Sequence, residues 1–168
     1  MSKTFFFIHT VILLLLQLIL FDNVQYGSLL YINIYILAVI MAPDELGNTV
    51  TLCLAFLLGL IVDIADNTMG IHAASATLLA YIRPGLLKFL VTHQPSPVKV
   101  ALYSRTASGF VKYASVSTVI FFFALMLLEA FSFKGFLMTL ARVVCSSAVS
   151  SGLVILYYYT AIRIGHHD

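Results

Sequence analysis

Charged residues are scarce in this chain. Asp, Glu, Lys and Arg make up only 10% of its 168 residues, whereas a soluble domain contains roughly 25% of them. Cysteine is also scarce, since only Cys53 and Cys145 are present. Both fall inside apolar segments, so they suggest neither a disulfide framework nor a zinc site. The shortage of charge argues against a water-soluble domain with an ordinary polar surface.

Long apolar runs dominate the sequence instead. Hydrophobic residues make up 61% of the chain, and its mean hydropathy is +1.04. From Phe5 to Thr160, apolar runs of roughly 15 to 20 residues alternate with short polar breaks, and a helix of about this length crosses ~30 Å of hydrocarbon. The first run is not followed by a small-residue cleavage pattern, so we expect it to be retained. The pattern predicts an integral membrane protein.

The polar breaks divide the chain into six predicted spans within a single membrane domain, residues 1–168. We expect Arg83-Pro84 to close the fourth span, because proline cannot donate a backbone hydrogen bond. A helix from Ser96-Pro97 to Leu128 would be too long for one crossing, so we expect its inner part to protrude, to lie on the membrane surface or to break, with a break favoured near Gly109. The predicted fold class is all-α, a six-transmembrane-helix bundle. Its spans cover residues 5–21, 24–42, 46–62, 68–82, 113–128 and 135–160.

The positions of Lys and Arg predict the orientation of this bundle. The cations of one side of the six-span arrangement are Lys3, Arg83, Lys88, Lys99, Arg105, Lys112 and Arg163. The opposite side has Lys134 alone in its loops. Short loops rich in Lys and Arg stay in the cytoplasm, so both termini are predicted to be cytoplasmic.

The stretch between the fourth and fifth spans forms a predicted cytoplasmic basic surface. Two ligands stay open for it: anionic lipid headgroups, which attract such cations, or an acidic cytoplasmic protein. Nucleic acid is not expected, because the stretch contains no known binding module and no aromatic stacking platform. The surface consists of Arg83, Lys88, Lys99, Arg105 and Lys112.

A few polar residues interrupt the apolar spans. His9 is predicted to lie near the membrane interface, and Gln17 to form an interhelical hydrogen bond. Asp63, at the end of the third span, faces the negative end of its helix dipole and needs a donor. The N–H groups at the start of the fourth span and Arg142 are both available. We favour a buried Asp63–Arg142 ion pair over a proton or ion pathway, which would show several acids at mid-depth.

Small residues mark the sixth span. Pairs four residues apart allow neighbouring backbones to approach closely. Packing inside the bundle is the favoured interpretation, and a contact with a partner helix is the alternative. The predicted packing or partner-helix faces contain Ser147 with Ser151 and Ala148 with Gly152.

Catalytic patterns are missing from the sequence. The histidines are scattered over different spans and loops, and no nucleophile elbow, phosphate-binding glycine loop or close pair of carboxylates occurs. We therefore expect a protein that is not an enzyme, with no catalytic, cofactor-binding or metal site.

The predicted hairpin of the third and fourth spans has a recognisable pattern. Gly59-Leu60 and Asp63 come at the end of one helix, Gly70 lies in the turn, and the next helix reaches Ala80-Tyr81. This pattern resembles the hairpin signature of the rod shape-determining protein MreD family. The chain length and the basic loop after the fourth span also fit that family, although outside the hairpin the match is one of hydropathy.

The resemblance implies a non-enzymatic membrane scaffold of the bacterial cell-elongation machinery, located in the cytoplasmic (inner) membrane. Members of the family bind the single-span protein MreC and help to couple filaments of MreB to the peptidoglycan synthases. Their bundle is similar to the substrate-binding subunits of energy-coupling-factor transporters. No cofactor and no small-molecule substrate are implied.

A vitamin-binding subunit of an energy-coupling-factor transporter is the alternative. Those subunits present alanine-rich motifs in their first span for docking a transmembrane partner. Here the segment from Phe5 to Phe21 contains neither Ala nor Gly. The scaffold is therefore the favoured interpretation, and a co-purifying small molecule would favour the carrier.

Overall fold

Helices make up all regular secondary structure in the described part of the chain. The computed structural model describes residues 3–21, 32–91, 107–129, 143–153 and 155–156. An apolar helix, Val143–Leu153, follows the labelled elements. Those are α1 (Lys3–Leu16), the π-helical turn η1 (Gln17–Phe21), α2 (Ile36–Ile40), the 3-10 turn η3 (Asp44–Leu46), α3 (Asn48–Asp66), α4 (Ile71–Val91) and α5 (Ala107–Glu129).

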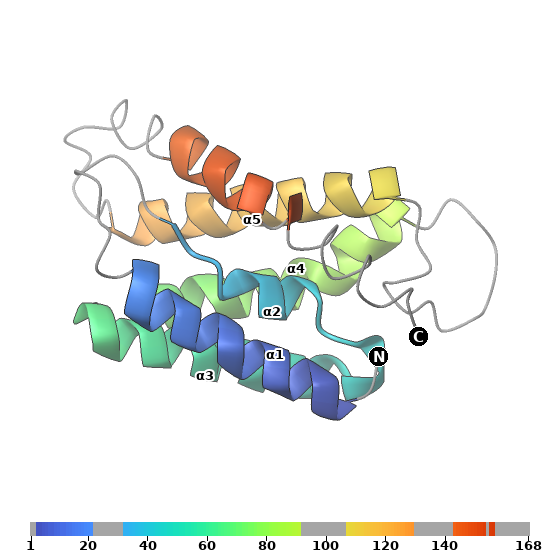
Figure 1. The fold of residues 1–168 in the computed structure, drawn as a ribbon. Helices are drawn as coiled ribbons and strands as arrows, with labels where there is room; N and C mark the ends of the chain where they lie inside the picture. Colours follow the sequence, from blue (N-terminus) through green and yellow to red (C-terminus); the bar gives the residue numbers. More distant parts are fainter. Residues whose placement is uncertain (1–2, 22–31, 92–106, 130–142, 154, 157–168) are drawn as a thin grey trace.

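The helices lie side by side, and consecutive ones run in alternating directions along the bundle (Figure 1). The α3–α4 hairpin forms one pair, and α4 also packs along α5. The short α2 contacts α1, α3, α4 and α5. Every residue from Tyr35 to Ala42 is buried, so α2 is the central element of the described bundle.

The second predicted span contains a much shorter helix than expected. Residues 32–34 are not helical, and α2 covers only Ile36–Ile40. Residues 24–31 lie outside the described part. The Gln17 side chain bonds backbone groups that would have backbone partners in a helix. Its Oε1 accepts the Ile34 N–H at 2.8 Å, and its Nε2 donates to the Ile32 carbonyl at 3.1 Å. Non-helical backbone can be buried when its polar groups are paired in this way.

Gln17 therefore does bond a distant segment, but its partners lie in the non-helical residues 32–34 and not in a neighbouring helix, as had been predicted. Gln17 lies in the π-helical turn that continues α1, and its side chain is buried. An extra residue per turn widens a helix locally and is common at sites with a special role. In this chain the π-helical turn places the Gln17 side-chain amide beside residues 32–34, which lead into α2.

Arg83-Pro84 does not close the fourth helix, so that prediction was wrong. α4 continues through Pro84 to Val91. Proline removes one backbone hydrogen bond and bends a helix, but Leu79 and Ala80 before it and Leu87 after it are all buried in the core. Packing on both sides of the proline stabilises the helical path that the local sequence disfavours.

The third and fifth helices are longer than predicted. α3 ends at Asp66, so Asp63 lies in its last turn, and Asn67 ends the helix with φ 55° while its N–H bonds the Asp63 carbonyl. α5 begins at Ala107 and passes through Gly109 without a break. The inner part of that stretch, residues 96–106, lies outside the described part.

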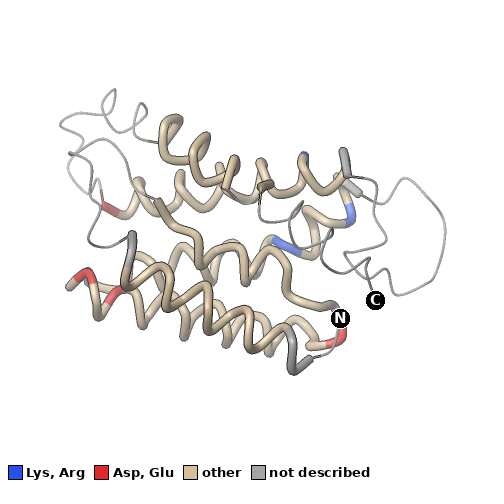
Figure 2. The backbone as a smooth tube through the Cα atoms, in the orientation of Figure 1, with Lys and Arg blue, Asp and Glu red and all other residues tan. Residues whose placement is uncertain are grey.

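Two described helices are long and apolar enough to cross a membrane. They are Asn48–Asp66 and Gly109–Glu129, and the helix Val143–Leu153 is apolar but shorter. The described charged residues lie toward the ends of the bundle, and its long middle section is almost free of them (Figure 2).

Candidate functional site

Asp63 joins the two helices of the α3–α4 hairpin through hydrogen bonds. The residue is 2% exposed, and its carboxylate accepts the N–H of His72 at 3.0 Å on Oδ1 and the N–H of Ala73 at 2.8 Å on Oδ2. The Thr68 hydroxyl also donates to Oδ1. The first N–H groups of a helix have no partner within it, and the N-terminus carries a partial positive charge. Asp63 therefore caps α4 from the last turn of the preceding helix.

Gly59 brings the two helices into backbone contact one turn before this cap. A Cβ placed on Gly59 would lie 2.5 Å from the Cα of Ala73 and 2.6 Å from its nitrogen. Such distances leave no room for any side chain. The two backbones therefore approach closely at Gly59, against the same turn of α4 that Asp63 caps.

The other residues of the hairpin pattern lie around this contact. Leu60 is half-buried on α3, and Gly70 has a φ of +83° in the turn, a conformation that favours glycine. Ala80 packs in the core, whereas Tyr81 is 73% exposed on the outside of α4. The pattern thus combines residues that build the hairpin with one that faces outward.

The predicted Asp63–Arg142 ion pair stays a prediction, because Arg142 lies outside the described residues. Of the two donors considered for Asp63, the N–H groups of α4 are the ones that the described residues place on its carboxylate.

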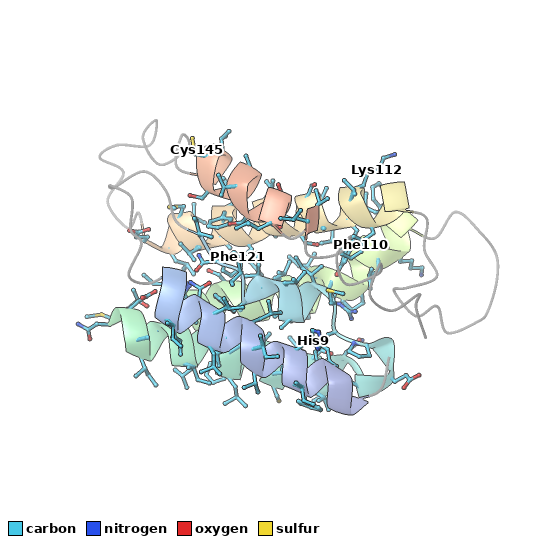
Figure 3. All side chains as sticks on the ribbon, in the orientation of Figure 1. His9, Phe110, Lys112, Phe121 and Cys145 are labelled. Atoms are coloured by element: carbon cyan, nitrogen blue, oxygen red, sulfur yellow. The ribbon has the colours of Figure 1, made fainter. Side chains whose placement is uncertain are left out.

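His72 joins the same end of the hairpin to α2. Its Nδ1 lies 3.3 Å from the Tyr35 hydroxyl, and its Nε2 lies 3.6 Å from Oδ2 of Asp66. Phe121 of α5, labelled in Figure 3, packs edge-on against the Tyr35 ring with centroids 5.9 Å apart. The sequence interpretation treated His72 as one of several scattered histidines. The signal it missed is the short turn, which brings Asp66 and His72 together.

Arg83 is not part of an exposed basic surface, so that assignment was wrong. The residue is 3% exposed, and its side chain donates to the carbonyl of Ala42, just after α2. The Tyr113 hydroxyl of α5 donates to the nearby Ile40 carbonyl at 3.3 Å. Because α4 continues past Arg83, this residue faces the unpaired carbonyls at the end of α2 instead of a loop.

Two other members of the predicted basic surface are exposed. Lys88 lies in the last turn of α4 and Lys112 near the start of α5, where its side chain points outward (Figure 3). Lys99 and Arg105 lie outside the described residues.

In the helix Val143–Leu153, the serines are buried or half-buried, whereas the smaller residues Ala148 and Gly152 are exposed. Ser146, Ser147 and Ser150 are buried, and Ser151 is half-buried. Ala148 and Gly152 are exposed, and a Cβ on Gly152 would meet nothing within 4 Å. The Ser147 face therefore packs inside the bundle, whereas the Ala148–Gly152 face is exposed among the described residues.

Polar and apolar side chains are distributed in an unusual way over the described helices. Large apolar residues are exposed on α1, α3, α4 and α5, while hydroxyl, amide and ionisable side chains are buried between the helices. Within the same residues, no cluster of His, Cys, Asp and Glu is suited to hold a metal ion.

Comparisons with models of protein families, with curated proteins and with solved structures find no match for this chain. The hairpin is therefore interpreted from its own contacts.

Proposed function

We propose that this chain is a six-span helical bundle in the bacterial cytoplasmic (inner) membrane. The side-chain distribution supports this proposal, because a large exposed apolar surface aggregates in water but matches lipid tails. Buried serine, threonine and glutamine can hydrogen-bond between helices in that environment. Exposed members of this apolar surface include Phe7, Val11, Leu15, Phe56, Leu57, Ile64, Leu78, Phe123 and Leu127.

The charges support an orientation for the bundle. Lys88 and Lys112 are exposed at the end where α4 finishes and α5 begins, whereas Asp66 and Glu129 lie toward the opposite end. By the preference of Lys and Arg for the cytoplasmic side, the end with Lys88 and Lys112 is cytoplasmic, and so are both termini.

Within the membrane, we assign the bundle the role of a non-enzymatic scaffold of the MreD type. It binds the transmembrane helix of MreC and helps to couple MreB filaments to the peptidoglycan synthases, and thereby regulates cell shape. The single observation that carries this proposal is the α3–α4 hairpin, where the family's motif residues have defined structural roles. Gly59 permits the backbone contact and Asp63 caps α4.

The outer faces of the same hairpin suit a partner helix. A rigid helix pair with an exposed apolar surface can receive a single transmembrane helix by side-chain packing without unfolding first. The exposed side chains of this surface include Leu57, Ile61 and Ile64 of α3 and Leu78 and Tyr81 of α4.

A pull-down from native membranes tests the scaffold. Tagged wild-type protein in mild detergent should capture a single-span protein with a periplasmic domain, and Gly59→Leu should capture much less of it. Gly85→Leu is the matched control, because a Cβ on Gly85 meets nothing within 4 Å. Equal capture by the two glycine variants would contradict the role of the hairpin. A co-purified vitamin-like molecule without such a partner would favour the transporter subunit.

Reporter fusions test the six-span orientation separately. A cytosol-active reporter inserted near Gln94 or fused at Asp168 should be active, and so should a periplasm-active reporter near Lys134. Activity of the periplasmic reporter at Gln94 would contradict the six-span arrangement.

A further inference from the structure

Two exposed lysines lie at one end of the bundle, and the described contacts do not neutralise them. Lys88 lies in the last turn of α4, and Lys112 points outward near the start of α5 (Figure 3). Neither ammonium group makes an ion pair or a hydrogen bond with the described residues. Glu45, an exposed acid in η3 at this end, pairs with neither of them. The two lysines therefore present positive charge to the surroundings of the bundle.

The contact between α3 and α4 gives the position of Lys88 along the bundle. Gly59 meets the backbone of Ala73 in two helices that run in opposite directions. Asn48 and Pro84 lie the same number of residues from this contact, toward the same end. The first residue of α3, Asn48, is therefore level with Pro84. Lys88 lies one turn further along α4, about 6 Å beyond the start of α3.

This position corresponds to the lipid headgroups. The inference rests on the membrane bundle proposed above, in which α3 crosses the hydrocarbon core and a headgroup layer extends roughly 5 to 7 Å beyond it. Lys112 precedes Tyr113, whose hydroxyl reaches the Ile40 carbonyl at the end of α2. It lies near the same boundary, and its long side chain can extend to the headgroups. Phe89, 81% exposed next to Lys88, adds an apolar ring.

We propose that Lys88, Phe89 and Lys112 form a binding site for an anionic phospholipid. The two ammonium groups attract the negatively charged headgroup, and the Phe89 ring packs on an acyl chain. A zwitterionic lipid gains less, because its own cation offsets its phosphate. The position of the lysines favours a lipid over an acidic cytoplasmic protein, since a soluble protein would have to enter the headgroup layer to reach them.

Tryptophan fluorescence tests this site in a bilayer. The chain contains no tryptophan, so Phe89→Trp introduces a single fluorophore beside the lysines. The full chain is reconstituted into mixtures of phosphatidylglycerol and phosphatidylcholine, and one of the two lipids carries brominated acyl chains that quench the fluorescence. At equal mole fractions, brominated phosphatidylglycerol should quench more strongly than brominated phosphatidylcholine. High salt should reduce this preference, because it screens exposed charges.

Lysine variants in the Phe89→Trp background identify the cause of the preference. Lys88→Gln and Lys112→Gln should each lower the preference for phosphatidylglycerol by up to about fivefold, the effect of one cation near a membrane surface. The double variant should lose the preference. Lys88→Arg keeps the charge and should retain it.

Ile64→Trp is the matched control, because Ile64 is 73% exposed near the opposite end of α3. Both brominated lipids should quench this reporter equally, and the lysine variants should not change the result.

Two results would overturn the lipid site while the control reporter is quenched. One is equal or absent quenching of the Phe89→Trp reporter by the two lipids, and the other is an unchanged preference in the double lysine variant. Binding of a soluble acidic protein that requires both lysines, without a lipid preference, would assign this surface to a protein instead. If neither lipid quenches either reporter, the chain does not lie in the bilayer, and the proposed membrane bundle fails as well.

Discussion

Two regions of the bundle pair backbone groups with side chains, and they do so with opposite chemistry. At the start of α4, the Asp63 carboxylate accepts hydrogen bonds from the N–H groups of His72 and Ala73. At the end of α2, Arg83 and Tyr113 donate to the carbonyls of Ala42 and Ile40. We call these regions the Asp63 cap and the α2 clamp.

The difference follows from what each helix end leaves unpaired. The first turn of a helix has free N–H groups and the last turn has free carbonyls, so an anion suits the first and donors suit the second. In the Asp63 cap, a single charged group engages two N–H groups and a hydroxyl. The α2 clamp divides its donors between α4 and α5. We therefore expect the cap to contribute more to stability per side chain than the clamp.

Removing the carboxylate of the Asp63 cap should have the largest effect. Asp63→Ala leaves two buried N–H groups without acceptors, at about 1 to 3 kcal/mol for each. The free energy of unfolding in detergent should fall by the sum, and membrane abundance should fall with it. Asp63→Asn keeps one acceptor oxygen and should lose less.

A control and a coupling test accompany this prediction. Glu45→Gln changes an exposed acid in the η3 turn before α3 and should leave the free energy of unfolding unchanged. If Arg142 also pairs with Asp63, the double variant Asp63→Asn/Arg142→Gln should lose less stability than the sum of the single losses. Additive losses would mean that the two residues act separately.

Removing the cation of the α2 clamp should have an intermediate effect. Arg83→Met keeps a long apolar side chain but removes the donor to the Ala42 carbonyl, and hydrogen bonds of charged groups contribute about 1.5 to 3 kcal/mol. Unfolding titrations should show this loss, whereas Lys88→Met, one exposed cation further along α4, should show almost none. Equal losses in the two variants would place Arg83 among ordinary surface cations.

Removing the hydroxyl of the α2 clamp should have the smallest effect. Tyr113→Phe keeps the buried ring and loses one neutral hydrogen bond of 3.3 Å, which corresponds to about 0.5 to 1.5 kcal/mol. A loss in the unfolding free energy larger than that of Arg83→Met would reverse the ranking within the clamp and assign its main contact to α5.

Local patterns predicted the parts of this protein that depend on neighbours along the chain. The polar breaks indicated where α1 and α3 lie, and Gly59 with Asp63 indicated a tight hairpin, because the residues concerned lie within a few turns of each other. The hydrogen bond of Gln17 was predictable as well, since an amide in an apolar run needs a partner. Its partners at Ile32 and Ile34 were not identified.

The break before α2 had a signal that was overlooked. Aromatic or polar residues alternate with isoleucine from Tyr31 to Ile36, a period of two that is typical of extended backbone and not of a helix. Hydropathy alone cannot distinguish the two, because every second residue of this stretch is as apolar as those of the helices around it.

Composition and periodicity by themselves determined that the described chain is helical and that its long helices are apolar, because these properties follow from the residues of each segment. Only the tertiary structure decided that α4 continues through Pro84, that Arg83 is buried on α2, and that His72 meets Tyr35. Each of these depends on a group supplied by a distant part of the chain. Packing from α5 and α2 can offset a lost hydrogen bond or a buried charge that the local sequence disfavours.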